Sequence, residues 1–278
     1  MSTYSFIECP DSYMGQSIPV DHLIAAGRTE FQSFELFENH GLGKVLVLDG
    51  VVQLSERGEF VYSEAMAHIP LFGHGEVEDV LIIGGGDGAV LEEVLKHRGV
   101  KSVTLVDLDG EVMDLCRQHF GAIHNNAFDD PRVTVHVADG IDYVRTCNRT
   151  FDAILVDGPD PVGPGTAADP LFTQEFFGLC RLRLTESGVF VIGNDMPYRN
   201  PEACADTVAK LKQFYKDAGL FLAAVPDYQG GPLCWAWASD EPIDVPFEGA
   251  HILGLRYWNE DVHHGSFQLP NYVRELVR

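Results

Sequence analysis

Short apolar runs rich in Val and Ile alternate with stretches of helical pattern from residue 76 onward. Strands buried on both faces have this composition, because helices cover each side of a parallel sheet. The alternation predicts an α/β domain with a mainly parallel sheet and helices on both faces. The predicted strands are 79–83, 102–107, 133–137, 151–156 and 189–193, and the predicted helices are 89–97, 111–120, 173–182 and 201–218.

Two further apolar runs, 221–225 and 233–239, are separated by a short connection, which predicts an antiparallel pair at the end of a seven-stranded sheet. Residues 1–60 instead have the pattern of short strands. Within them, Asp49-Gly50 joins two apolar runs and predicts a hairpin over 44–55 with a type I′ turn. We therefore expect a small antiparallel β domain at 1–60 and an α/β domain at 61–278.

Composition and charge narrow the classes of partner. Forty-two acidic residues against 19 Lys and Arg leave a net charge of −23, which disfavours nucleic acid and favours cations, although solubility alone also accounts for it. No run of 18 apolar residues predicts a membrane span. Six scattered cysteines without a C-x-x-C pair favour reduced thiols, a cytoplasmic location and no zinc site. His263-His264 lack companions at metal-ligand spacing, so no metal is expected.

The most specific motif is a strand followed by a glycine-rich turn and a helix, over residues 80–89. Glycines such as Gly84 and Gly86 let the backbone approach a ligand closely, and such turns bind nucleotides in α/β sheets. Asp87 within the turn disfavours phosphate and favours a ligand with a positive charge. The alternative is that Asp87 serves only as a helix N-cap.

Carboxylates also follow the next two predicted strands. Asp107 lies about 20 residues after the glycines, where an acid accepts hydrogen bonds from ribose hydroxyls. Asp139, followed by Gly140, is placed to accept from an adenine amino group, whereas Asp109 is expected to be a surface or cap residue. Acids at three strand ends predict a nucleoside pocket without phosphate contacts, which favours an S-adenosyl sulfonium over NAD.

The fourth strand ends in a loop, residues 157–164, that holds two carboxylates and three prolines. Prolines restrict the loop and hold Asp157 and Asp160 in place. Paired acids that face a cleft bind an amine and also take its proton. The alternative is a simple turn rich in Asp and Pro.

These residues, with several further segments, resemble the spermidine synthases of the polyamine aminopropyltransferase family, most closely the bacterial type. The similarity extends over essentially the whole chain. The matching segments are 48–57 (LDGVVQLSER), 59–62 (EFVY), 81–88 (LIIGGGDG), 128–132 (FDDPR), 157–164, 171–173 (LFT), 225–228 (VPDY), 256–259 (RYWN) and 267–270 (FQLP).

The resemblance implies a methyltransferase-like Rossmann fold after a small β domain, and a homodimer or homotetramer. It implies transfer of the aminopropyl group of decarboxylated S-adenosylmethionine, a co-substrate, to a diamine such as putrescine, without a cofactor or metal. Asp157 is then the general base. The implied donor-binding residues are Gln32, Gly84, Gly86, Asp87, Asp107, Asp139, Gly140 and Pro164, and the implied acceptor-binding residues are Tyr62, Asp157, Asp160 and Tyr228.

The acid–base and leaving-group chemistry of such a transfer is consistent with these roles. A diamine with a pKa near 10.4 arrives as a cation, so one amine must lose its proton before it attacks the carbon next to the sulfonium. The sulfonium is itself the leaving group, and Tyr62 and Tyr228 suit a methylene chain with cationic ends. Asp87 would repel the carboxylate of ordinary S-adenosylmethionine.

Four departures from the family pattern weaken the assignment of putrescine itself. Ser63 stands where the family has His or Gln, Asp107 where it has Glu, and Gly158-Pro159 where it has a small hydroxyl pair or Cys-Thr. Asp195 adds a carboxylate near the acceptor channel, either as a cap before the next helix or as a group for a more basic or longer acceptor. Alternatives are a different amine acceptor, an S-adenosylmethionine-dependent methyltransferase of small amines, or a non-catalytic polyamine or nucleoside binding protein.

Overall fold

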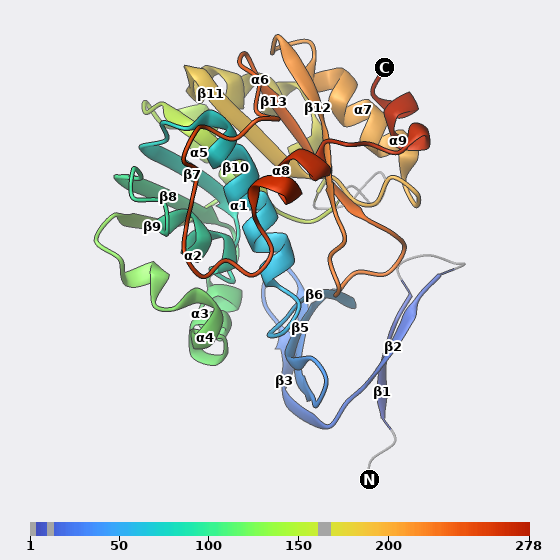
Figure 1. Ribbon diagram of the computed structural model, residues 1–278. Coiled ribbons are helices and arrows are strands. Elements are labelled where there is room, and N and C mark those ends of the chain that lie inside the picture. Colours follow the sequence, from blue (N-terminus) through green and yellow to red (C-terminus); the bar gives the residue numbers. More distant parts are fainter. Residues whose placement is uncertain (1–3, 10–13, 161–167) are drawn as a thin grey trace.

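The computed structural model describes residues 4–9, 14–160 and 168–278. Its larger sheet has seven strands in the order β12-β13-β11-β10-β7-β8-β9 (Figure 1). All its pairings are parallel except those of β13, which is antiparallel to both neighbours. The predicted methyltransferase-like Rossmann sheet is therefore confirmed. The strands are β7 (Asp79–Gly84), β8 (Ser102–Asp107), β9 (Val133–Val137), β10 (Phe151–Asp157), β11 (Leu184–Gly193), β12 (Asp217–Ala223) and β13 (Leu233–Ser239).

Helices cover both faces of this sheet, and each face has its own apolar core. On one face, alternate strand residues such as Val80 and Ile82 pack against α1 (Phe60–His74) and α2 (Ala89–Leu95). On the other, Leu81 and Ile83 belong to the core that includes α5 and α6. Burial on both sides explains why these strands are continuously apolar. Five further helices follow later in the chain, namely α5 (Gly140–Thr146), α6 (Gln174–Arg183), α7 (Pro201–Leu211), α8 (Glu260–Ser266) and α9 (Asn271–Leu276).

The N-terminal residues form antiparallel strands below the α/β sheet in Figure 1. In the hairpin turn Asp49 and Gly50 have φ of 46° and 80°, so the predicted type I′ turn is confirmed. The strands are the pair β1 (Ser5–Glu8) and β2 (Gln16–Pro19), and a four-stranded sheet of β3 (His22–Arg28), β4 (Ser33–Asn39), β5 (Gly43–Leu48) and β6 (Val51–Ser55).

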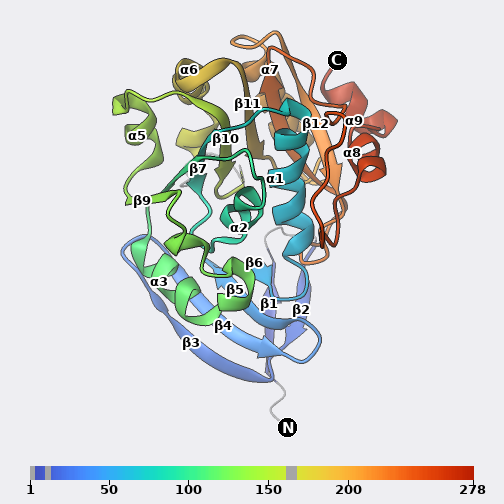
Figure 2. The same ribbon diagram turned by 60° about the vertical axis from the view of Figure 1, so that its left-hand side comes forward.

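One helix of the α/β part packs on this four-stranded sheet (Figure 2). Val112 and Phe120, near the two ends of α3 (Gly110–His119), are buried against Leu36 and Leu46. The shared core fixes the N-terminal sheet next to the end of β8. Three short helical segments follow, namely α4 (Gly121–His124), η1 (Ala127–Asp129) and, further along the chain, η2 (Asp169–Phe172).

One predicted helix boundary is wrong. The helix expected over 201–218 ends at Leu211, and β12 begins at Asp217 rather than at 221. Ala218 pairs with Ala238 of β13. The residues at the start of β12 therefore form a strand, although their local sequence pattern is also compatible with a helix. Helix α5 was not predicted, because Val144 is its one fully buried residue and a single such position shows no helical period.

The carboxyl ends of the parallel strands face the N-terminal sheet. After β8, Asp109 accepts hydrogen bonds from Thr29 and Gln32, at 2.6 and 3.0 Å. After β12, Asp227 accepts from the backbone and side chain of Ser55. These hydrogen bonds join the strand ends of the α/β part to the N-terminal sheet.

Candidate functional site

The glycine-rich turn after β7 lies directly against the end of β10. Gly84 has φ of +80°, and a Cβ there would lie 2.0 Å from the carbonyl oxygen of Asp157. The same oxygen accepts from the backbone N–H of Gly85 at 2.9 Å. At Gly86 a Cβ would meet Asp107 Oδ2 at 2.7 Å, because the Gly86 N–H donates to that oxygen. Only glycine permits such close approach, which explains the spacing of the motif.

Asp107 and Asp87 lie on either side of this turn. Asp107 accepts backbone N–H bonds from Gly86 and Asp109, at 2.9 and 2.8 Å, which fix its carboxylate at the end of β8. Asp87 accepts from the N–H of Ala89 at 2.8 Å. Gly88, not Asp87, is the N-cap of α2, so the cap alternative is wrong in detail although Asp87 does bind the first N–H of the helix. Burial raises the pKa of both carboxyls, and Asp107 raises that of Asp87 further.

Asp109 is a buried cap rather than a surface residue. It is 3% exposed and accepts from the N–H of Val112 at the start of α3. Its Oδ2 also accepts from Thr29 and from the amide of Gln32. The predicted donor residue Gln32 is thus held beside the end of β8 by a contact that sequence reasoning missed, since it joins residues 77 positions apart.

Asp139 lies at the start of α5, after β9. It is exposed, and its Oδ1 accepts from the N–H groups of Ile141 and Asp142 as a helix N-cap. Gly140 packs so closely on β7 that a Cβ there would lie 2.3 Å from Cγ2 of Ile83. Both residues therefore have a structural reason for their identity besides the predicted contact with an adenine.

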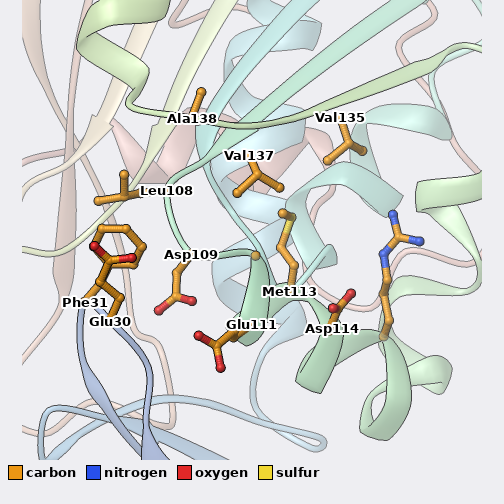
Figure 3. A pocket seen from close by; sticks show the side chains of 12 residues that line it. Glu30, Phe31, Leu108, Asp109, Glu111, Met113, Asp114, Val135, Val137 and Ala138 are labelled. Carbon is orange, nitrogen blue, oxygen red and sulfur yellow. The ribbon is translucent and has the colours of Figure 1, made fainter.

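A groove of 680 Å³ opens between the β3–β4 turn, α3 and β9 (Figure 3), and its lining includes Leu108 and Ala138, the sequence neighbours of Asp107 and Asp139. Phe31, Leu108 and Val137 give it an apolar rim, with 44, 45 and 62% of their surfaces exposed. Exposed apolar side chains of this size next to polar strand ends suit a flat aromatic ligand. The lining residues are Glu30, Phe31, Leu108, Asp109, Gly110, Glu111, Met113, Asp114, Arg117, Val135, Val137 and Ala138.

Asp157 is the centre of a second, aromatic part of the site. Its Oδ1 accepts a hydrogen bond of 2.8 Å from the hydroxyl of Tyr62, on α1. The Tyr62 and Tyr228 rings lie edge to face with centroids 6.1 Å apart, and Tyr62 also contacts Trp235. The Tyr228 hydroxyl donates to the carbonyl of Gln53 at 2.6 Å, which holds its ring against the N-terminal sheet. The two predicted tyrosines therefore lie together beside Asp157.

Asp160 lies beside the segment that follows β11. Its Oδ1 accepts from the N–H of Asp195 at 3.1 Å. Asp195 is 4% exposed, has φ of +58°, and binds its neighbour Met196 N–H through its own carboxylate. The N-cap of α7 is Asn200, so the alternative that Asp195 caps this helix is wrong.

The carboxylates of the site perturb one another. Burial, with the charges of Asp87, Asp107 and Asp160, raises the pKa of Asp157 to about 8, although the Tyr62 hydrogen bond lowers it. Burial and the charge of Asp195 raise the pKa of Asp160 to about 7. Carboxyls that are this reluctant to ionise indicate a site suited to a cation.

Glu59 is a site residue that the sequence did not reveal. Burial, with the charges of Glu93 and Asp87, raises its pKa to about 7. Its Oε2 accepts a hydrogen bond of 2.8 Å from Ser63, which is 1% exposed. The Ser63 hydroxyl, one of the departures noted above, is thus engaged by Glu59. The available signals were the i, i+4 spacing of the two residues and the place of Glu59 in the matching segment 59–62.

Part of the predicted site lies outside the described residues. Pro164 belongs to 161–167, whereas Gly158 is half-buried and Pro159 is exposed. Within the described ranges, no group of three or more His, Cys, Asp or Glu is arranged to hold a metal ion. No described helix is long and apolar enough to cross a membrane.

Comparison with known proteins gives matches over both parts of the chain. Residues 59–247 match the family described as "Spermine/spermidine synthase domain", and residues 4–56 match "Spermidine synthase tetramerisation domain". The polyamine aminopropyltransferase of Serratia proteamaculans is 41% identical over 95% of this chain and 93% of its own. That of Sodalis glossinidius is 42% identical over 94 and 93%.

Solved structures agree. A spermidine synthase in complex with the transition-state analogue AdoDATO superposes with a TM-score of 0.90 and 32% identity, over 100% of this chain and 96% of the other. The spermidine synthase of Thermotoga maritima gives 0.88 and 31%, over 100 and 95%. With sequence and fold similar over nearly the full length, the chain belongs to the spermine/spermidine synthase family.

Proposed function

We propose that this protein transfers the aminopropyl group of decarboxylated S-adenosylmethionine to a diamine such as putrescine. The amine lone pair attacks the propyl carbon bound to sulfur, the carbon–sulfur bond breaks with its electron pair on sulfur, and methylthioadenosine leaves. The amine loses one proton, so the products are an aminopropylated amine and methylthioadenosine. The family, its relatives' names and the fold support this reaction.

The observation that carries the proposal is the group of mutually perturbed carboxyls at adjacent strand ends. Asp87, Asp157 and Asp160 all have raised pKa values. A site that binds a sulfonium and two ammonium groups needs such acids, because each bound cation stabilises the ionised form. The phosphates of a dinucleotide ligand would be repelled instead.

Asp157 is proposed as the general base. With a pKa of about 8 in the free protein, it is a stronger base than an ordinary aspartate. The Tyr62 hydrogen bond orients its carboxylate, and Tyr62 and Tyr228 form an aromatic wall for the methylene chain. Asp160 would bind the amine at the other end of the acceptor.

The donor is proposed to lie from Asp87 toward the groove of Figure 3. Asp87 would bind its aminopropyl ammonium and Asp107 its ribose. The adenine would lie near the exposed Leu108 and Val137, which are next to the strand ends that carry Asp107 and Asp139. The glycines of the turn after β7 allow the backbone to approach a ligand closely, which supports this position of the donor. The remaining proposed donor contacts are Gln32, Gly84, Gly86, Gly140 and Pro164.

Assembly, location and domain boundary are further proposals. The match of residues 4–56 to a tetramerisation domain supports a homo-oligomer, for which we propose a tetramer. The six cysteines, all within described residues, are free, which supports a reducing, cytoplasmic environment. A boundary near residue 60 would place the start of α1 at the junction of the two domains.

A product assay by mass spectrometry tests the reaction. The purified protein is given decarboxylated or ordinary S-adenosylmethionine, each with putrescine, cadaverine, agmatine or spermidine. An amine that gains an aminopropyl group, with release of methylthioadenosine, is the expected result. A methylated amine would select the methyltransferase alternative. Donor binding without turnover of any amine would select a binding protein.

A further inference from the structure

A buried carboxylate ties the loop after β12 to the N-terminal sheet. Asp227 is 6% exposed, and its Oδ2 accepts from the backbone N–H of Ser55 at 2.9 Å. Its Oδ1 accepts from the Ser55 hydroxyl at 2.6 Å, and the oxygen of that hydroxyl accepts from the N–H of Gly58 at 3.0 Å. Asp227 and Ser55 thus form a clamp between residues 172 positions apart, and its ionised acceptor makes the two hydrogen bonds strong.

Position 58 leaves room for this clamp. A Cβ at Gly58 would lie 2.2 Å from Oδ1 and 2.5 Å from Cγ of Asp227. Gly58 does not have a positive φ, so its backbone conformation does not itself require glycine. The close approach of the Asp227 carboxylate therefore explains the glycine at this position.

The clamp holds the backbone that carries Tyr228. Tyr228 follows Asp227 directly, and its N–H bonds the carbonyl of Val225 at 3.3 Å in the same turn. The Tyr228 hydroxyl donates at 2.6 Å to the carbonyl of Gln53, which lies on β6 two residues before Ser55. Tyr228 is therefore attached to the same strand twice, through the carboxylate of its neighbour and through its own hydroxyl.

The ring held in this way packs on the tyrosine that bonds the proposed general base. Tyr228 and Tyr62 lie edge to face with centroids 6.1 Å apart, and Tyr62 donates to Asp157 at 2.8 Å. We propose that Asp227 is a positioning residue for the acceptor amine, because it fixes Tyr228 and with it one wall of the acceptor site against the N-terminal sheet. This inference rests on the proposed aminopropyl transfer, in which Asp227 acts through Tyr228 and not by contact with the substrate.

A second buried carboxylate joins the two parts of the chain at the donor end and supplies a matched control. Asp109 is 3% exposed and accepts from the Thr29 hydroxyl at 2.6 Å and from the Gln32 amide at 3.0 Å. It also lines the groove proposed for the adenine. Removal of either carboxylate leaves buried donors unpaired and lowers stability, but the two removals should impair different substrates.

The test measures the KM for putrescine and the KM for decarboxylated S-adenosylmethionine, each with the other substrate saturating. We expect Asp227→Ala to raise the putrescine KM by about tenfold or more and the donor KM by less than about threefold, because the loop that carries Tyr228 loses its attachment. Asp109→Ala should show the reverse. Asp227→Asn should keep both KM values within about threefold of wild type, since its carbonyl still accepts from the Ser55 N–H and its amide donates to the Ser55 hydroxyl.

A double variant tests the packing of the clamp. Gly58→Ala should raise the putrescine KM as Asp227→Ala does, because the added Cβ displaces the carboxylate. The protein with both substitutions should have a putrescine KM no higher than that of Asp227→Ala alone, since the space is then free. Effects that multiply in the double variant would show that the two positions act independently, and would contradict the clamp.

Two results would overturn the proposal. Equal increases of both KM values in Asp227→Ala would show a merely structural role. An Asp227→Asn protein as impaired as Asp227→Ala would show that the charge acts on the amine directly. Failure of the underlying reaction looks different, because wild type then forms no product from any amine. Urea unfolding establishes that each variant is folded, and Gly58→Ala carries the test where Asp227→Ala does not fold.

Discussion

Replacing Asp157 with Asn should make the free protein more stable at alkaline pH and nearly inactive. Asn is isosteric and still accepts the Tyr62 hydrogen bond, but it needs no ionisation. In the wild type, burial with the charges of Asp87, Asp107 and Asp160 raises the pKa of Asp157 to about 8. An unfolded Asp has a pKa near 3.9, so between about pH 4 and 8 the folded state binds more protons than the unfolded state.

Stability contributed by such a group is lost as the pH rises toward the folded pKa. From pH 6 to pH 8, this carboxyl alone should lower the free energy of unfolding by roughly 2 kcal/mol. Asp157→Asn should remove that part of the pH dependence. The assay is urea unfolding of both proteins at pH 6 and pH 8, with the free energies extrapolated to water.

Two further measurements complete the experiment. Asp217→Asn, at an exposed carboxylate at the start of β12, is the matched control and should keep the wild-type pH dependence. Turnover of Asp157→Asn should fall by about 10²–10⁴-fold, the usual contribution of a general base. An Asp157→Asn protein with the wild-type pH dependence of stability, or with near-normal turnover, would refute the assigned environment or the assigned role.

Three other substitutions have defined outcomes. Tyr62→Phe removes the 2.8 Å hydrogen bond that lowers the pKa of Asp157. The acidic limb of the pH dependence of kcat/KM should therefore move to higher pH by about one unit. An acidic limb that does not move would show that the ionisation of Asp157 does not govern it. Gly84→Ala should lower the free energy of unfolding, measured in urea, by at least about 3 kcal/mol. Gly50→Ala, at the same φ of +80° but with open space around it, should lower it by only about 1 kcal/mol. Equal losses of stability in the two variants would contradict the clash between a side chain at position 84 and Asp157. Asp87→Asn should weaken calorimetric binding of decarboxylated S-adenosylmethionine relative to ordinary S-adenosylmethionine by tenfold or more, and an unchanged ratio would remove Asp87 from donor selection.

The sequence predicted those strands whose apolar pattern has a single physical cause, burial of the strand on both faces of the sheet. A doubly buried strand must be apolar throughout, so β7, β8 and β10 were visible in the sequence. The β12 boundary was missed because its cause is not local. Residues 217–220 form a strand since β13 lies beside them, and no periodicity in a single segment reports its neighbour.

The same distinction applies to the site. Asp107 and Asp157 were placed correctly at the ends of β8 and β10, the two neighbours of β7, because parallel strands bring their carboxyl ends to one edge of the sheet. Glu59 was missed, since its burial beside Asp87 depends on how α1 crosses that edge. Asp109 was expected at the surface or as a cap, and its buried contacts with Thr29 and Gln32 come from the turn between β3 and β4 of the N-terminal sheet.

The acceptor end shows why sequence departures need a structure before they are interpreted. Asp195 as an extra carboxylate suggested a longer or more basic acceptor. In the structure its carboxylate binds the N–H of Met196, while its backbone N–H binds Asp160. Asp195 is thus fixed against Asp160 by contacts within the protein, so an extra acid in the sequence does not by itself indicate a longer or more basic acceptor.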